Sequence, residues 1–260
     1  MLWGRVKTAE GDIISGEIRD GHIIPGTGLG DIAPDTAALS LADAIWLSPC
    51  APGKFIGLWN NYHAAAEKNG HVIPDHPLWF LKPLSSIVGH GAEVALPIAA
   101  GRVIFEGELA VVIGKRCHMA SAIEAEAAIF GYTCVNDLTS LDVLNANPAF
   151  PQWARAKGFD GFGVIGPVIA TGLNWRELSI RVLVNGRERQ AYSASDMILP
   201  PADIVRKLSF DMTLEPGDVI AVGTSLGVRP VKIGDQVSVV IDGIGALDVT
   251  LSQPVNADAT

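Results

Sequence analysis

Cysteine is scarce in this sequence of 260 residues, which contains only Cys50, Cys117 and Cys134. They are odd in number, widely spaced and never arranged as C-x-x-C, so they predict a reducing compartment and argue against a disulfide framework or a structural zinc. Positive charge is also in short supply. The 19 Lys and Arg face 28 Asp and Glu, for a formal net charge of −9. That balance argues against nucleic acid as a partner, because such surfaces carry clustered positive charge.

Long apolar runs are missing as well. The longest, such as 109–113, fall far short of the about 20 residues that a membrane helix needs, so no membrane partner is expected. The first residues show no basic segment followed by an apolar one, which predicts no signal peptide and a cytoplasmic protein. Neither a G-x-x-x-x-G-K-[ST] loop nor a strand-linked G-x-G-x-x-G is present, so no nucleotide cofactor is implied.

What the sequence does have is glycine (28) and proline (16) in a chain that is 48% hydrophobic. This composition favours many turns and a mainly β (α+β) fold over a helix bundle. We expect a small N-terminal β domain over 1–48, with hairpin turns at 10–12 and 19–21, and a larger domain over 54–254. In the larger domain we expect a single central strand over 103–113 and helices over 63–68, 121–130 and 202–208.

Two glutamates in the predicted central strand carry the clearest chemical signal. Residues i and i+2 of a strand point to the same face, so Glu106 and Glu108 would project together. Two adjacent carboxylates in an apolar strand are costly unless they are neutralised, and a hard divalent cation does this well. Asp137, at the end of another strand-like run, is a candidate third ligand. The alternative is a solvent-facing pair and an aspartate that caps a turn.

Several short motifs follow one another between 54 and 251. They are Lys54-Phe-Ile-Gly-Leu58, Phe80-Leu-Lys82-Pro83, Glu106-Gly-Glu108, Gly131-Tyr-Thr-Cys-Val-Asn-Asp137, Lys157-Gly-Phe-Asp160, Val184-Asn-Gly-Arg-Glu-Arg-Gln190 and Gly223-Thr224. In this order they resemble the fumarylacetoacetate hydrolase (FAH) family, and the resemblance covers most of the chain.

The resemblance implies a fold, a metal and a class of substrate. The fold would be the FAH-type mixed β-sandwich roll with a small N-terminal β domain, in a protein that is usually a homodimer. Glu106, Glu108 and Asp137 would hold Mg²⁺ or Mn²⁺. The substrate would be a 2-oxo or 2,4-dioxo acid that chelates the metal through its carboxylate and keto oxygens. A metal bound in this way stabilises a developing enolate.

The resemblance also implies roles for residues outside the metal set. Lys157 would hold a substrate oxygen as a positive point charge. Gln190, Thr224 and the adjacent Gly223 would bind substrate, and Lys82 either binds substrate or has a structural role.

Many members of the family carry Asn-Tyr-x-x-His-x-x-Glu, in which the histidine and glutamate activate a water. Counting from Gly57 puts His63 at the histidine position, whereas Glu67 comes one residue late. At i, i+4 on a helix both side chains still share one face. We therefore hypothesise that His63 is the base and Glu67 orients it; the alternative is a partly exposed histidine with no such role. The other histidines, including His71, are predicted to be surface or loop residues, and the Trp and Phe residues to be core.

A second departure from the family is Leu141, where relatives commonly carry an arginine that anchors an acidic substrate. Leu141 suggests a substrate whose far end is less charged, or one that is anchored elsewhere, for example by Arg155 or Arg189.

Together these features predict a metal-dependent hydrolase that cleaves a C–C bond in an acylpyruvate-like 2,4-dioxo acid, in the catabolism of aromatic or related compounds. The first alternative is a decarboxylase or keto–enol tautomerase acting on oxaloacetate or a ring-cleavage product. The second is a binding protein without catalytic activity that has kept the fold.

Overall fold

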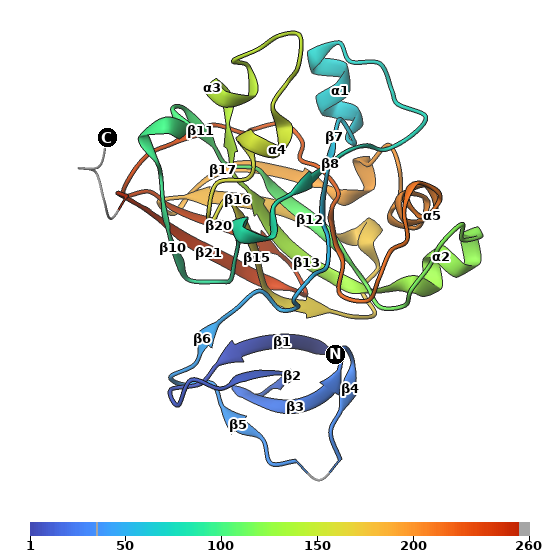
Figure 1. The fold of residues 1–260 in the computed structure, drawn as a ribbon, viewed down its shortest axis with the longest axis vertical. Helices are drawn as coiled ribbons and strands as arrows, with labels where there is room; N and C mark the ends of the chain where they lie inside the picture. Colours follow the sequence, from blue (N-terminus) through green and yellow to red (C-terminus); the bar gives the residue numbers. More distant parts are fainter. Residues whose placement is uncertain (35, 255–260) are drawn as a thin grey trace.

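The computed structural model describes residues 1–34 and 36–254, and over these residues the chain forms three β-sheets with five α-helices around them (Figure 1). The predicted mainly β (α+β) class is therefore confirmed. The first and last strands of the described chain lie in different parts of the molecule. The first strand belongs to the lower group of strands in Figure 1, whereas the last strand lies in the main body above it.

The largest sheet runs in the order β4-β3-β2-β1-β15-β13-β12-β18-β7-β8, with three short strands paired at its sides. Its path strands are β1 (Leu2–Lys7), β2 (Ile13–Arg19), β3 (His22–Gly28), β4 (Asp31–Ile32), β7 (Phe55–Trp59), β8 (Leu78–Lys82), β12 (Gly107–Ile113), β13 (Ile129–Asp137), β15 (Gly163–Ala170) and β18 (Val219–Ala221). The side strands are β5 (Leu39–Ser40), β6 (Ile45–Trp46) and β9 (Ile87–Val88).

The N-terminal strands form the expected hairpins and also join the main body. Turns at 8–12 and 20–21 connect β1, β2 and β3, as the sequence predicts. β1 then pairs antiparallel with β15, with Leu2 opposite Ala170 and Trp3 opposite Ile169. The N-terminal strands, drawn in blue in Figure 1, are thus continuous with the large sheet through one strand pair.

Two smaller sheets complete the body. One has the order β10-β21-β20-β16-β17 and the other β14-β11-β19. Their bounds are β10 (Ala92–Ala95), β21 (Gly245–Ser252), β20 (Gln236–Ile241), β16 (Ser179–Val184), β17 (Arg187–Ser193), β14 (Thr139–Ser140), β11 (Val103–Ile104) and β19 (Pro230–Val231). The five-stranded sheet packs on β12, β13 and β15. Leu109 and Val111 of β12 lie in one apolar cluster with Val182 and Val239 of that sheet.

The prediction of a single strand over 103–113 is wrong. β11 ends at Ile104 in the small three-stranded sheet, and β12 begins at Gly107 in the large one. The chain changes sheet across Phe105 and Glu106, where the Glu-Gly-Glu motif interrupts an otherwise apolar segment. The apolar residues on both sides of the motif suggest one strand because both pieces are buried, and all seven residues of β12 are buried.

The helices are α1 (His63–Asn69), α2 (Ala122–Ala128), α3 (Leu141–Leu144), α4 (Trp153–Ala156) and α5 (Pro201–Asp211). The predicted helices over 63–68, 121–130 and 202–208 correspond to α1, α2 and α5. The cap of α2 has the reciprocal Ser121–Glu124 bonds of a capping box. Gly70 ends α1 in the left-handed conformation. Within the described residues, none of the helices is long and apolar enough to span a membrane.

Candidate metal and substrate site

The register of two antiparallel strands brings three carboxylates together. Gly107 of β12 lies opposite Asn136 of β13, so Glu106 lies opposite Asp137, whose backbone N–H donates to the Glu106 carbonyl at 2.9 Å. Glu108 projects from β12 on the same side. One oxygen from each of Glu106, Glu108 and Asp137 lies within 4.8 Å of the others. The three predicted metal ligands are therefore adjacent, although Glu106 precedes the strand in which it was expected.

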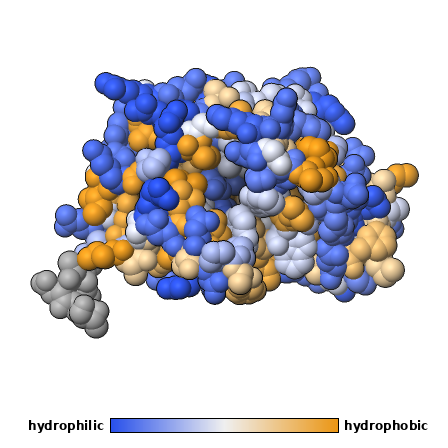
Figure 2. All heavy atoms as spheres, turned by 90° about the horizontal axis from the view of Figure 1, so that it is seen from above, coloured by the Kyte–Doolittle hydropathy of each residue, from blue (hydrophilic) through white to orange (hydrophobic). Residues whose placement is uncertain are grey.

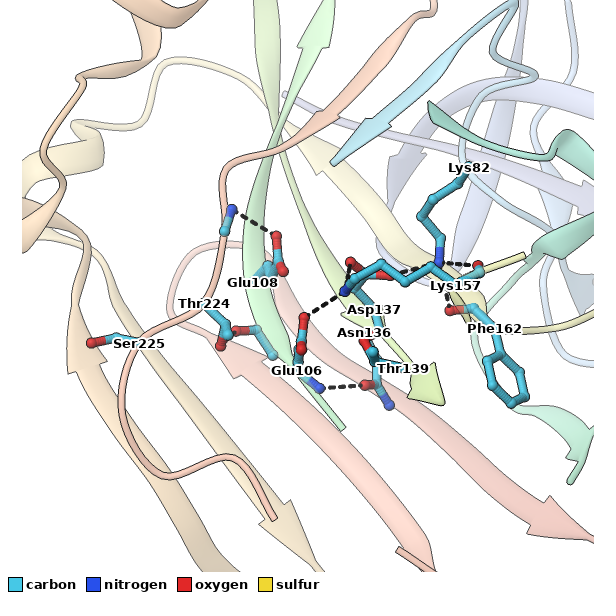
Figure 3. A network of polar contacts seen from close by, with 12 residues as sticks. Lys82, Glu106, Glu108, Asn136, Asp137, Thr139, Lys157, Phe162, Thr224 and Ser225 are labelled. Carbon is cyan, nitrogen blue, oxygen red and sulfur yellow. Dashed lines mark hydrogen bonds and ion pairs between the residues drawn. The ribbon is translucent and has the colours of Figure 1, made fainter. Parts of the chain in front are cut away.

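Two lysine side chains donate hydrogen bonds to these carboxylates, as Figure 3 shows. The Lys157 ammonium donates to Glu106 Oε2 at 2.7 Å and to Asp137 Oδ2 at 2.5 Å. The Lys82 ammonium donates to Asp137 Oδ1 at 2.6 Å and to the backbone carbonyls of Lys157 and Phe162. We call Lys82, Glu106, Glu108, Asp137 and Lys157 the charged cluster. Its members are almost fully buried, and Glu106 is the most exposed carboxylate, at 15%.

Burial and mutual charge perturb these groups in different directions. Burial raises the pKa of Glu108 well above its ordinary value, and the charges of Asp137 and Glu106 add to this effect. Burial alone would also raise the pKa of Asp137, but the positive charges of Lys157 and Lys82 outweigh it and hold that pKa below its ordinary value. Burial alone would lower the pKa of Lys157, but the negative charges of Asp137 and Glu106 outweigh burial and raise that pKa above its ordinary value. The Asp137–Lys157 pair is therefore held in its charged form, whereas Glu108 has no hydrogen-bonded cation among the described residues.

The residues present fit a divalent cation. The donors are carboxylate oxygens, the ligand type that Mg²⁺ and Mn²⁺ prefer. Three carboxylates and two ammonium groups leave one excess negative charge in a buried place, which is costly when uncompensated. A dication would reverse the excess to one positive charge, and the carboxylate of a 2-oxo acid would then neutralise it. The charge of Glu108, which has no lysine at hydrogen-bonding distance among the described residues, is the one that gains most from such an ion.

Gly107 and the residues around it hold the glutamates in place. A Cβ at Gly107 would lie 2.2 Å from Val182 Cγ2 of the neighbouring sheet, so the Glu-Gly-Glu motif needs its glycine for close packing. Gln190, Tyr192 and Thr224 all bond to Gly107: Gln190 accepts from its N–H at 3.3 Å, and the two hydroxyls donate to its carbonyl. The loop that contains Thr224 is thereby tied to the start of β12.

The predicted substrate-binding residues occupy different positions around the cluster. The Gly223 N–H donates to Glu108 Oε2 at 2.8 Å, so it orients a metal-ligand candidate. Gln190 is buried, and its amide donates to Thr224 Oγ1 and to the Ser225 carbonyl. Thr224 lines the adjacent cavity. Lys82 lies fully buried between Asp137 and the backbone carbonyls of Lys157 and Phe162, to all of which it donates (Figure 3).

A cavity of about 220 Å³ lies next to the charged cluster, and Glu106 and Lys157 are part of its wall. This volume suits a small metabolite rather than a drug-sized ligand, for which pockets span roughly 300–1,000 Å³. The cavity lies at the end of the molecule that carries α1, α3 and α4 (Figure 1). Seen from above, this end mixes hydrophobic and hydrophilic residues around a central hollow (Figure 2).

The remainder of the cavity wall is mostly apolar. Its residues come from β7, β8, α3, α4 and the loop before β19, and we call them the apolar wall: Leu58, Trp59, Phe80, Leu141, Leu144, Trp153 and Val228. The rings are arranged in a chain. Phe80 stacks on Trp153 with ring centroids 5.3 Å apart, and Trp153 lies 6.0 Å from Trp59. The Phe80 ring covers Gly57, where a Cβ would lie 2.4 Å from it.

The structure does not bring His63 or Glu67 to this cavity. Both lie on α1 as expected, but both are exposed to solvent and neither is part of the cavity wall. α1 contributes Ala65 and Asn69 instead. The role of the His63–Glu67 pair therefore stays a prediction that this arrangement does not support.

His71 is a cavity residue that the sequence interpretation missed. It lies in the loop after α1, as predicted, but it also lines the cavity and packs against Trp59 at a centroid distance of 4.8 Å. Asn60, with its φ of 58°, holds that loop by donating from Nδ2 to the Val72 carbonyl at 3.0 Å. Trp59 and Trp153 were missed in the same way, because both were predicted to be core residues.

Arg155 and Arg189, the alternative anchors for an acidic substrate, are exposed and are not part of the cavity wall. A larger cavity, of about 490 Å³, lies between the N-terminal strands and residues 84–92, but none of its lining residues belongs to the charged cluster.

Comparison with known proteins gives four findings. Residues 54–252 match the model of the family described as fumarylacetoacetate (FAA) hydrolase, C-terminal. Oxaloacetate tautomerase YisK of Bacillus subtilis is 37% identical over 205 residues, which cover 74% of this chain and 67% of that protein. The crystal structure of 2-hydroxyhepta-2,4-diene-1,7-dioate isomerase from Mycobacterium marinum aligns with a TM-score of 0.87 and 36% identity, over 98% of this chain and all of that one. An uncharacterized protein of Archaeoglobus fulgidus is 42% identical over 202 residues, covering 78% of this chain and 80% of that protein.

Proposed function

Since the chain belongs to the fumarylacetoacetate hydrolase family, we propose that it is a divalent-metal enzyme that cleaves the C–C bond of a 2,4-dioxo acid. The observation that carries the proposal is the cluster of Glu106, Glu108 and Asp137 with Lys157, buried at one end of a cavity of metabolite size. Hard oxygen donors beside a fixed ammonium group suit a substrate that brings a carboxylate and a keto oxygen together.

The reaction that this site would catalyse is R–CO–CH₂–CO–COO⁻ + H₂O → R–COO⁻ + H⁺ + CH₃–CO–COO⁻. Water attacks the distal carbonyl carbon, the bond from that carbon to the methylene breaks, and its electron pair passes into the pyruvate unit as an enolate. A bound Mg²⁺ or Mn²⁺ supplies Lewis-acid stabilisation of the negative oxygen. The Lys157 ammonium stabilises the same charge and is kept protonated by Asp137 and Glu106.

A water nucleophile needs a group that accepts its proton. Among the described residues of the cavity wall, His71 is the one histidine; it is exposed to solvent, and Trp59 packs against its ring. Histidine is the side chain that most often serves as a general base in enzymes. In this proposal His71 takes the proton from water, and His63 and Glu67 keep that role only if a movement of α1 brings them to the cavity.

Keto–enol tautomerisation of oxaloacetate or a related 2-oxo acid is the second candidate. It needs the same enolate-stabilising cluster but no water nucleophile, and it is favoured by the exposed positions of His63 and Glu67. The resemblance to YisK and to the Mycobacterium marinum isomerase supports it as well. Decarboxylation of oxaloacetate would use the same enolate.

Product analysis by NMR separates these reactions. Acetylpyruvate, fumarylpyruvate and oxaloacetate are offered separately with Mg²⁺ or Mn²⁺, and again with EDTA. Pyruvate plus a second acid, formed only with metal, supports the hydrolase. A changed keto–enol ratio or CO₂ from oxaloacetate, with no cleavage of either acylpyruvate, replaces it with the tautomerase or decarboxylase. If none of the three compounds reacts, they are excluded as substrates, and the test moves to 2,4-dioxo acids with a larger apolar far end.

A further inference from the structure

The apolar wall shares the cavity with Glu106 and Lys157 of the charged cluster, so a bound molecule contacts both charged and apolar side chains. Trp59, Phe80 and Trp153 present a continuous chain of rings. Lys157 connects the cluster and the wall, because its ammonium lies 5.1 Å from the centre of the Phe80 ring while it donates to Glu106 and Asp137. A substrate whose 2-oxo acid end lies at the cluster must therefore place its far end against rings and leucines.

A second carboxylate at that far end would find no free lysine or arginine among the described residues of the cavity wall. Lys157 is the one lysine or arginine among the described residues that line the cavity, and two carboxylates already accept from it. Arg155 and Arg189 are exposed outside the wall. A carboxylate placed there would lose its hydration without gaining a counter-charge, which is strongly unfavourable.

The wall is instead suited to a planar apolar group. Phe80 and Trp153 stack nearly in parallel, with 18° between their planes, and Leu141 and Leu144 lie on the short helix α3 beside α4. Offset stacking and edge contacts with such rings favour an aromatic guest over an aliphatic one of equal size.

We propose that the apolar wall is an aryl-binding subsite, so that the substrate is a 2-oxo acid with an aromatic far end, of the aroylpyruvate class, and not a dicarboxylate. This inference rests on the proposed function, because it assumes that a 2-oxo acid binds at the charged cluster. The distal carbonyl of an aroylpyruvate then lies between the cluster and the rings, next to His71.

Equilibrium binding tests the inference without any turnover. The probes are 4-phenyl-2-oxobutanoate, 2-oxoadipate and pyruvate, which lack the second keto group and so resist C–C hydrolysis. Calorimetry of the full chain with Mg²⁺ should give at least about tenfold tighter binding of the phenyl compound than of 2-oxoadipate. Equal or tighter binding of 2-oxoadipate overturns the aryl subsite and leaves the proposed function standing. Failure of all three probes to bind overturns both.

Substitutions then locate the subsite. Trp153→Ala should weaken binding of 4-phenyl-2-oxobutanoate about tenfold and change pyruvate binding less than twofold. Trp79→Ala is the matched control, because Trp79 is on β8 but is not part of the cavity wall. If Trp153→Ala fails to fold by circular dichroism, Trp153→Leu replaces it. Loss of affinity for pyruvate and the phenyl compound alike overturns the assignment.

A further substitution adds to the cavity wall a cation that could pair with a second carboxylate. Leu141→Arg should raise the affinity for 2-oxoadipate and reverse its order with the phenyl compound, since Leu141 lines the cavity and is only partly buried. Ile123→Arg, at an exposed position on α2, is the control for added charge. An unchanged order in the Leu141→Arg protein contradicts the inference.

Discussion

Glu106 and Lys157 of the charged cluster line the same cavity as the apolar wall, yet the cluster and the wall are held in different ways. The Asp137 carboxylate accepts hydrogen bonds from two ammonium groups. The Gly223 N–H donates to Glu108, and Gly107 lets the strand between the glutamates pack closely against the neighbouring sheet. The apolar wall rests partly on the four-residue helices α3 and α4 and on the ends of β7 and β8. A dense buried network allows little change, whereas short surface segments tolerate it. The comparison suggests that the cluster defines the chemistry and the wall defines the substrate.

The largest expected effect comes from removing the shared counter-charge of the cluster. Asp137→Asn leaves Lys82 and Lys157 buried without their common partner, and we expect the free energy of unfolding to fall by about 3–5 kcal/mol. Urea denaturation with EDTA present measures this apart from any metal effect. Asp242→Asn breaks a mostly exposed pair with Arg181 and should change stability by less than about 1 kcal/mol. Equal losses in the two variants would contradict the account of the cluster.

The next effect is on the chemical step. Lys157→Met removes the ammonium that stabilises the enolate oxygen, and turnover should fall by about 10²–10³-fold. Lys68→Met, at an exposed position on α1, is the control and should behave as the unmodified protein does. Rates must be compared at temperatures where circular dichroism shows both variants folded. A Lys157→Met protein with more than a tenth of the original turnover would exclude the proposed role.

Metal binding should stabilise the cluster and leave the apolar wall unaffected. At a metal concentration 100 times the dissociation constant, Mg²⁺ or Mn²⁺ should raise the free energy of unfolding by about 2.7 kcal/mol. Glu108→Gln should abolish this gain, because Glu108 is the carboxylate without a lysine partner among the described residues. Glu126→Gln, exposed on α2, should keep it. Thermal unfolding with and without metal measures the difference, and an undiminished gain in Glu108→Gln would exclude that ligand.

The last prediction concerns the histidines, where the cavity geometry and the family pattern disagree. His71→Ala should lower hydrolysis by about 10²-fold, within the range of general-base contributions, whereas His63→Ala should stay within twofold of the original rate. Steady-state kinetics on an acylpyruvate measures both. The opposite outcome would return the base to His63 with Glu67, and would require α1 to approach the cavity during catalysis.

Much of the charged cluster could be predicted from the sequence because it follows from strand periodicity and from ordered motifs. The i, i+2 spacing of Glu106 and Glu108 is visible in the chain itself. The position of Asp137 opposite Glu106 is not, because it depends on the register of β12 with β13. The break between β11 and β12 could not be predicted because buried apolar residues lie on both sides of the Glu-Gly-Glu motif, so the whole segment suggests one strand.

The apolar wall could not be predicted in the same way. His71, Trp59 and Trp153 meet only because the loop after α1 and the short helix α4 turn toward the end of β7. Such long-range loop courses leave no periodic pattern in the sequence. One local signal was present, since a glycine at 57 directly before Leu58 leaves room for an aromatic ring on the neighbouring strand, and Phe80 takes it.

Binding of oxalate tests the central claim most directly, because oxalate has the two neighbouring oxygens of a 2-oxo acid but neither a far end nor a scissile bond. Calorimetry of the full chain compares Mg²⁺ with EDTA, and the unmodified protein with Glu106→Gln. The account predicts that oxalate binds only with Mg²⁺ present and that Glu106→Gln weakens it at least about tenfold. Equally tight binding of oxalate in EDTA, or in Glu106→Gln, would contradict a metal-centred 2-oxo acid site at this cluster.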